Sequence, residues 1–288
     1  MRTRLLALAL PLLLIGCSQA LDYSVDNPTG APLKLQIDGT AYEVPAHAAT
    51  EVTLEPGAHS LRSEQLGEVK FIVYRNGKSG LINPTLSDYV IARETYITDE
   101  ANAKNFADIK TPIVIEGVTF EANHELTRAL FIDKQWTLGV REPFPETMEI
   151  HTPDKLGGNF VAKIFTAKDY IAYFETRNEV PGYFEQQRPE TVPSVLREVE
   201  VAPPLPELPP ELEAHAKPMR ELFANYLKAT DASEQERLQD AYFDTVMAYT
   251  SAAAPLYSKL TREANEQANQ FILTEGKAIG SSTAVIAK

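Results

Sequence analysis

Five prolines lie within the ten residues from Val201 to Pro210, and they limit what this part of the chain can form. Proline has a fixed φ and no backbone N–H, so such a run forms neither the interior of a helix nor a central strand. We expect a semi-rigid extended linker over residues 201–210. The alternative is a polyproline strap that packs along the β region before it. Either structure divides the chain into two parts of different character.

Before the proline run, apolar and polar residues follow the pattern of strands. Residues 33–37 alternate with period two, which is typical of a half-buried strand, and Asp38 with Gly39 predicts a hairpin turn. Thr166 and Asp169 predict the start of a short helix. We expect a small β-domain over residues 22–67 and a mainly β domain with a short helix over residues 68–200. Other strand-like runs are residues 69–74, 89–92, 113–115, 118–120, 129–132, 136–140 and 160–165.

After the proline run, apolar residues recur with the period of helices. The three apolar faces are Met219, Leu222, Phe223, Tyr226 and Leu227; Leu238, Tyr242, Phe243, Val246 and Met247; and Tyr257, Leu260, Ala264, Ala268 and Phe271. Ser233 with Glu236 predicts a capping box for the second helix, and Pro255 fits the first turn of the third. We expect a helical segment over residues 211–275, ended by Gly276, and a flexible tail over residues 276–288.

Together these patterns predict an α+β fold. An antiparallel β-sandwich-like body, of one or two β-domains, is followed by a C-terminal antiparallel helical hairpin or three-helix segment. The helical segment has about sixty-five residues, near the lower limit for independent folding. We therefore expect it to dock on the β body, on a second copy or on a partner.

The N-terminus has the layout of a secretory signal. Arg2 and Arg4 precede an apolar run from Leu5 to Ile15, which is far shorter than the ~20 residues that span a bilayer. Its end, Leu14-Ile15-Gly16-Cys17, resembles the lipobox of bacterial lipoproteins. The resemblance implies a signal peptide over residues 1–16, cleavage before Cys17, and a diacylglyceryl group and an amide-linked acyl chain (palmitate type) on Cys17. Residues 17–21 are then the lipidated cysteine and its tether. Several acyl chains anchor a protein stably.

The resemblance to lipoproteins also predicts a location. In the Gram-negative family, a serine after the cysteine, here Ser18, usually permits export to the outer membrane. We expect a lipid-anchored protein of the outer membrane, on its periplasmic face rather than at the cell surface. With Cys17 lipidated no thiol remains, which excludes disulfides and thiolate chemistry in the mature chain.

The first forty residues of the mature body show a second resemblance. Pro28-Thr29-Gly30-Ala31, the Asp38-Gly39 turn, and the run from Pro56 and Gly57 through His59 to Leu61 resemble the PEGA family of small extracytoplasmic β-domains. The Pro-Glu-Gly-Ala signature itself is absent. The family's domains bind or space and are not catalytic, so the resemblance implies a binding or spacing role for residues 22–67.

The charge of the chain excludes some partners. Loss of Arg2 and Arg4 with the signal leaves 25 basic against 40 acidic residues, a formal charge of −15. Nucleic acids are bound by lysine and arginine that neutralise phosphates, so we expect no nucleic-acid partner. We expect membrane attachment through the lipid, and an envelope protein or a second copy as the partner.

Motifs for catalysis and metal binding are weak. The histidines have no metal-ligand spacing; His47 with His59, or His124 with Glu125, are the only candidates worth naming. Glu142 and Glu146 flank a proline-rich loop and are the best guess for a carboxylate pair. We therefore predict no catalytic residue, no metal and no cofactor besides the lipid on Cys17.

The remaining candidates are aromatic and apolar side chains in loops and on helices, which often anchor partners. We expect a partner-binding role for Phe144, Tyr183, Phe184, Met219, Phe223, Tyr226, Tyr242 and Phe271. The predicted function is a non-enzymatic, outer-membrane lipoprotein that binds or scaffolds in the bacterial envelope. The alternative is a membrane-anchored hydrolase of envelope glycan or peptide. A pocket that gathers two carboxylates, or His124 with an acid, would favour the hydrolase.

The lipobox leads to a direct test. We expect the Cys17→Ala variant to stay uncleaved at the lipobox or to become soluble in the periplasm, because no thiol remains to accept the diacylglyceryl group. Fractionation with a carbonate wash measures this. Recovery of the variant with washed membranes would contradict the anchor.

Overall fold

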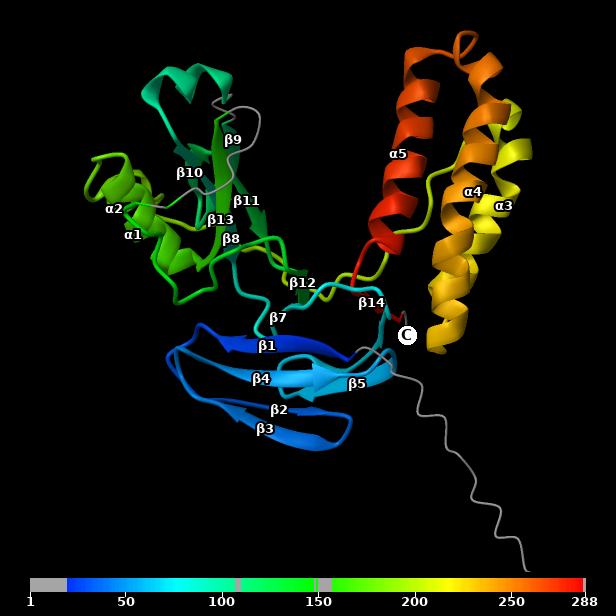
Figure 1. Ribbon diagram of the computed structural model, residues 1–288. Coiled ribbons are helices and arrows are strands. Elements are labelled where there is room, and N and C mark those ends of the chain that lie inside the picture. The colour runs from blue at the N-terminus through cyan, green and yellow to red at the C-terminus, as the bar shows by residue number, and fades with distance from the viewer. Residues whose placement is uncertain (1–19, 107–109, 148, 150–156, 287–288) are drawn as a thin grey trace, which may run out of the picture.

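The computed structural model has a β body from which two further parts project (Figure 1). One is a lobe of strands and short helices, and the other is a group of three long helices. The structure describes residues 20–106, 110–147, 149 and 157–286. The expected α+β class is confirmed: antiparallel sheets come first and the long helices follow.

The β body is a sandwich of two sheets. Its strands are β1 (Leu21–Asn27), β2 (Leu33–Ile37), β3 (Thr40–Val44), β4 (Ala48–Leu54), β5 (Gly57–Ser63), β6 (Gly67–Val73), β7 (Gly80–Ile82), β12 (Phe131–Asp133) and β14 (Thr283–Val285). One sheet has the order β12–β7–β1–β4 and the other β14–β6–β5–β2–β3. All neighbours are antiparallel except β1 and β7.

Alternating residues of these strands build the core. In β1 the side chains of Leu21, Tyr23 and Val25 are buried, and in β6 those of Val69, Phe71 and Val73 are buried in the same cluster. This is the period-two burial expected of strands that pack face to face. The predicted hairpin at Asp38 and Gly39 is present, with both residues at positive φ.

The sandwich is larger than the domain expected over residues 22–67. That boundary falls at the start of β6, which pairs with β5 along its whole length. Strands β7 and β12, from the expected second domain, extend one sheet, and β14, near the C-terminus, extends the other. Non-local pairing of this kind leaves no local signal in the sequence, because a short strand finds its partner only in the folded chain.

The lobe has a three-stranded sheet, a two-stranded hairpin and two helices. Its elements are β8 (Tyr89–Ile97), the 3-10 helix η1 (Glu100–Asn105), β9 (Thr111–Ile115), β10 (Val118–Ala122), β11 (His124–Thr127), β13 (Gly158–Thr166), α1 (Ala167–Arg177) and α2 (Tyr183–Gln187). Phe120 lies at the centre of its core, with the rings of Tyr170 and Phe174 packed edge-on against it. Thr166 caps α1 by accepting a hydrogen bond from the amide of Asp169, as predicted.

Residues 188–209 form a segment without helix or strand that joins the lobe to the long helices; we call it the strap. Its last part packs on the helices rather than on the β body: Leu208 is buried in their core, and Arg220 donates to the carbonyl of Pro206 at 2.8 Å. Its middle part does reach the sandwich, where Val199 packs against the core. The proline run over residues 201–209 thus has neither helix nor strand, Pro210 begins the helix that follows, and Leu208 fixes the end of the run on the helices.

Three helices follow, α3 (Pro210–Tyr226), α4 (Ala232–Tyr257) and α5 (Arg262–Ile279). The expected capping box is wrong: Asp231 caps α4, and its carboxylate accepts from the amides of Ser233 and Glu234. Pro255 lies near the end of α4 and not at the start of the next helix, which begins after Thr261. The helix starts earlier than expected because Asp231, not Ser233, supplies the capping carboxylate. It also runs past Pro255, because the residues after Asp231 are good helix formers.

The expected flexible tail is also wrong. Gly276 lies inside α5, which runs to Ile279. Thr283–Val285 then forms β14 on the edge of β6, and the amide of Ser282 bonds to the carboxylate of Asp133 at 3.1 Å. The end of the helical segment is thus built into the sandwich.

The helices also dock on the outer face of β6. Tyr226 of α3 stacks on Tyr74 with ring centroids 4.2 Å apart, and Gln235 of α4 donates to the carbonyl of Val73 at 3.1 Å. Ile72 and Tyr74 share a buried cluster with residues of all three helices. The expectation that the helical segment docks on the β body is therefore met within one chain.

We expect the fragment Glu211–Lys288 alone to be unfolded or self-associated. It loses the apolar face of Ile72 and Tyr74 and the pairing partner of β14, and each large side chain so exposed costs about 1.5–3 kcal/mol. Far-UV circular dichroism and sedimentation measure the outcome. A monomer that melts cooperatively would show that the helices need no support from the sandwich.

Candidate functional site

A cleft lies where the sandwich, the lobe and the helices meet. It has a volume of about 490 Å³ and is lined from within residues 125–135, 200–203 and 270–285. We call it the central cleft; β12, β14 and α5, which contribute lining residues, are labelled in Figure 1. Its size is within the range of small-molecule and peptide sites.

Helix α5 forms one wall of the central cleft. Gln270, Leu273, Thr274 and Lys277 line it and share one helical face by their spacing. Leu273 is 61% exposed, although it stands in the middle of this face. The opposite face of α5 is buried through Ala268, Phe271, Glu275 and Ile279. The helix thus has a packed face and an open, partly apolar one.

The other walls carry acidic side chains. Glu125, Asp133 and Glu200 line the cleft together with the single cation Lys277. Both oxygens of Asp133 accept from the amide of Ser282, at 3.1 and 3.3 Å. Burial raises the pKa of the Asp133 carboxyl, and its hydrogen bonds to Ser282 and the nearby Lys78 and Lys277 partly offset the rise.

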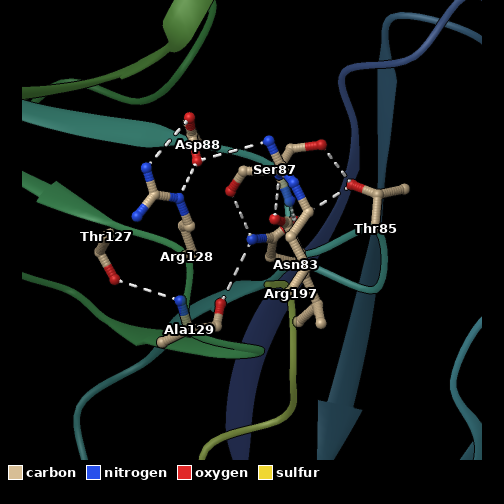
Figure 2. A network of polar contacts seen from close by, with 9 residues as sticks. Asn83, Thr85, Ser87, Asp88, Thr127, Arg128, Ala129 and Arg197 are labelled. Atoms are coloured by element: carbon tan, nitrogen blue, oxygen red, sulfur yellow. Dashed lines mark hydrogen bonds and ion pairs between the residues drawn. The ribbon is translucent and has the colours of Figure 1, made fainter. Parts of the chain in front are cut away.

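A polar network holds the lobe against the sandwich beside this cleft (Figure 2). Asp88, which is almost fully buried, accepts from the guanidinium of Arg128 and lies 3.7 Å from that of Arg197. Arg197 also donates to the carbonyl of Leu86. The Asp88 carboxylate, just before β8, therefore contacts both Arg128, just after β11, and Arg197 of the strap. Removal of one partner from a buried pair of this kind is costly because the other charge stays buried.

Asn83, at the centre of the same network, has no exposed surface. Its amide nitrogen donates to the carbonyls of Ser87 and Ala129, at 2.9 and 3.3 Å. Its oxygen accepts from the amide of Ser87 and from the hydroxyl of Thr85. All of its hydrogen bonds are made within the protein, which fixes residues 129–133 along the cleft wall.

A second buried carboxylate strengthens the junction. Asp26 of β1 has no exposed surface and accepts from the Tyr89 hydroxyl and from Nη1 of Arg141, both at 2.5 Å. Burial and then the charge of Asp26 raise the pKa of Tyr89. The hydroxyl therefore stays protonated and keeps donating. These two carboxylates give the lobe a defined position on the sandwich.

The eight side chains expected to bind a partner lie in several places. Met219, Phe223, Tyr226, Phe271 and Phe184 are buried within the chain, and Phe144, Tyr183 and Tyr242 are half-buried. None of the eight lines the central cleft. The buried five pack inside the protein, where their side chains form part of its core, and their partner-binding role stays a prediction.

The cleft residues were missed for a physical reason. Leu273 follows the predicted third face by two positions and looks like any apolar residue of a helix. Asp133 and Glu200 are ordinary acids in the sequence and meet only through the fold. The sequence offered one signal for this wall of the cleft. Gln270, Leu273 and Lys277 have the spacing of one helical face, and Leu273 is the apolar residue among them.

The other candidates from the sequence have structural partners. His124 is buried and bonds to the Tyr170 hydroxyl and, at 2.6 Å, to the carbonyl of Thr111; burial lowers its pKa. His59 bonds to Asp38 at 2.6 Å, and Glu142 accepts from the amide of Gly139 at 2.6 Å. Within the described residues, no three histidine, cysteine or acidic side chains form a group that would hold a metal ion.

Comparison with known proteins adds no assignment: the chain matches no family model, no curated protein and no solved structure. Among the described residues, no helix is long and apolar enough to cross a membrane. Cys17 and the whole signal segment lie outside the described residues, as does His151.

The packed face of α5 contains an unpaired acid. Glu275 has no exposed surface, and neither carboxylate oxygen has a hydrogen-bond partner in the described part of the chain. Burial raises its pKa from 4.5 to about 8. The pKa of Tyr242 on α4 is raised by burial and then by Glu275. The carboxyl is therefore protonated in the folded protein at neutral pH.

This acid makes stability depend on pH. Unfolded, Glu275 ionises near 4.5; folded, it holds its proton to about 8. The free energy of unfolding therefore falls as the pH rises from about 4.5 to 8. We expect Glu275→Gln to match the wild type at pH 4.5 and to exceed it at pH 7 by about 3 kcal/mol.

Urea unfolding of both proteins across this range measures the difference. The control is Glu263→Gln, an exposed acid in the first turn of the same helix. An equal, pH-independent change in both variants would show that Glu275 is not a buried, protonated acid.

Proposed function

We propose that this protein is a lipid-anchored, non-enzymatic binding or scaffolding component of the bacterial outer membrane, and that its partner binds in the central cleft. The observation that carries the proposal is the open face of α5. A leucine that is 61% exposed stands there, in a pocket formed by three parts of the chain. Such concave sites at the junction of domains are where proteins commonly bind ligands.

The rigidity of the junction supports the same role. The buried carboxylates of Asp26 and Asp88 fix the lobe, and β14 with the Tyr74–Tyr226 stack fixes the helices. The walls of the cleft thus keep their positions without a ligand. Preorganised walls lower the entropy that binding costs.

The proposed anchor and the helices start from one region. β1 begins at Leu21, beside the turn that holds Asn76 and Gly77. Asn76 contacts Gln239 near the start of α4, with 2.5 Å between Nδ2 and Oε1. The whole of α4, with 26 residues, is about 39 Å long. A lipid on Cys17 would therefore hold the sandwich near the bilayer and let the helices extend from it.

A photo-crosslinker at Leu273 tests the site in the intact envelope. We expect an adduct of discrete size, because this side chain points into the occupied cleft. The matched control is the same crosslinker at Phe243, which is 68% exposed on α4 and does not line the cleft. Thr274→Arg in the crosslinking protein should remove the adduct by filling the cleft with a charged side chain.

The outcomes are distinct. An adduct with the mass of two chains identifies a second copy as the partner, and another mass identifies a different envelope protein. Equal labelling at Leu273 and Phe243, or no adduct at Leu273, would contradict binding in the cleft.

A second candidate, an anchored hydrolase, rests on one observation. Glu125, Asp133 and Glu200 line one pocket, and neighbouring carboxyl groups are what glycosidases use. We favour binding because the Asp133 carboxylate is engaged by the Ser282 amide, which ties β12 to the start of β14. Release of sugars or peptides from isolated envelopes, lost in Glu125→Gln and Glu200→Gln, would favour the hydrolase.

A further inference from the structure

The charged side chains that line the central cleft are three acids and one cation. Glu125 comes from β11, Asp133 from β12 and Glu200 from the strap, whereas Lys277 belongs to α5. The same cleft is lined by apolar side chains, among them the exposed Leu273. A ligand of this cleft therefore meets a negative surface and an apolar one together.

Two of the acids have little pairing within the described part of the chain. The structure describes no hydrogen bond or ion pair for the exposed Glu200. Glu125 has one ion pair, to Arg93, and its length is 3.9 Å. An ionised carboxylate accepts about four hydrogen bonds through its two oxygens. Both side chains can therefore accept from a cationic donor of a ligand.

The third acid, Asp133, is held in place but its charge is not fully compensated. Burial raises the pKa of its carboxyl, although the hydrogen bonds to Ser282 and the charges of Lys78 and Lys277 oppose the rise. A further cation beside this carboxylate would favour its charged form, and a charge-assisted hydrogen bond between them would be a strong one.

The three acids do not converge on one point. Within the part of the chain that the structure describes, no three acidic, histidine or cysteine side chains form a group that would hold a metal ion. A single small cation would also leave Leu273 without an apolar contact. A chain that carries several cationic groups, with apolar side chains among them, matches both features of the cleft.

The described chain leaves the cleft open. All of its walls lie within the described ranges 110–147 and 157–286, and the chain leaves it at Val285. The next residue, Ile286, bonds to Lys70, and neither of these two lines the cleft. A second copy of this chain is a poor match for the cleft, because its formal charge is −13 and like charges repel across an interface.

We propose that the partner of the central cleft is a basic polypeptide segment, with an apolar side chain against Leu273 and lysine or arginine side chains toward Glu125, Asp133 and Glu200. This inference rests on the proposed function, since it names the chemistry of the partner for that same site. A cleft of about 490 Å³ admits a few side chains of a segment rather than a folded domain. Apolar contact holds the segment, and charge complementarity selects it and speeds its encounter.

The test uses the full lipidated chain in nanodiscs of zwitterionic lipid, with empty nanodiscs as the blank. The probes are a blocked synthetic peptide in which leucine and lysine alternate, and its match in which glutamate replaces lysine. We expect the lysine peptide to bind, and to bind more weakly as salt screens the charges. Equal affinity of the two peptides for the protein would overturn the proposal.

Charge changes at single residues place the peptide in the cleft. Glu200→Lys should weaken the lysine peptide about tenfold and strengthen the glutamate peptide. Lys277→Gln, which removes a like charge, should strengthen the lysine peptide about threefold. The matched control is Glu190→Lys, an exposed acid of the same strap that does not line the cleft. Equal effects of the two strap variants would show that only the net charge of the protein attracts the peptide, and would overturn the proposal.

The photo-crosslinker at Leu273 separates this inference from the function on which it rests. In the intact envelope, Glu200→Lys should reduce the adduct at Leu273 and Glu190→Lys should not. An adduct that Glu200→Lys leaves unchanged would overturn the basic character of the partner and leave binding in the cleft standing. Absence of any adduct in the unaltered chain would instead contradict the proposed function itself.

Discussion

Burial of β6 on both faces is the constraint on which the rest of the structure depends. Its inward residues, Val69, Phe71 and Val73, complete the core of the sandwich. Its outward residue Ile72 and the adjacent Tyr74 form the surface on which the three helices pack. A strand with one solvated face would leave the helices without a support, because their own cluster excludes water only when it is closed by these side chains. The same strand pairs with β5 and β14, so it joins the first and last parts of the chain.

Much of this could be predicted from local patterns. Residues 33–37 form a strand because one face meets the core, and Thr166 starts a helix because its side chain satisfies a free amide. The run from Val69 to Tyr74 is a stronger case: its nearly continuous apolar sequence indicates a strand covered on both sides. What the sequence patterns could not predict is pairing across long distances. β14 has three residues and no distinctive composition, and it is a strand only because β6 offers it an edge.

The candidate site could not be predicted from the sequence, again because it depends on contacts between distant parts of the chain. Each wall of the central cleft comes from a different part of the chain, and an acid such as Glu200 gains its setting only when the strap crosses beside α5. Aromatic residues were the obvious candidates, yet Phe184 and Phe271 are used as core. Large apolar side chains serve packing first, so their presence in a sequence indicates a core before it indicates a binding surface.

The position of β14 has a consequence for how the protein reaches its folded state. Synthesis from the N-terminus produces β1 to β6 well before β14. Until residues 283–285 are made, the edge of β6 has no pairing strand. Until the helices pack, the apolar surface around Ile72 and Tyr74 is open to water. Exposed strand edges and apolar surfaces tend to associate with other chains. The sandwich therefore closes only after residues 283–285 have been synthesised, and before that point its open edge is exposed to other chains.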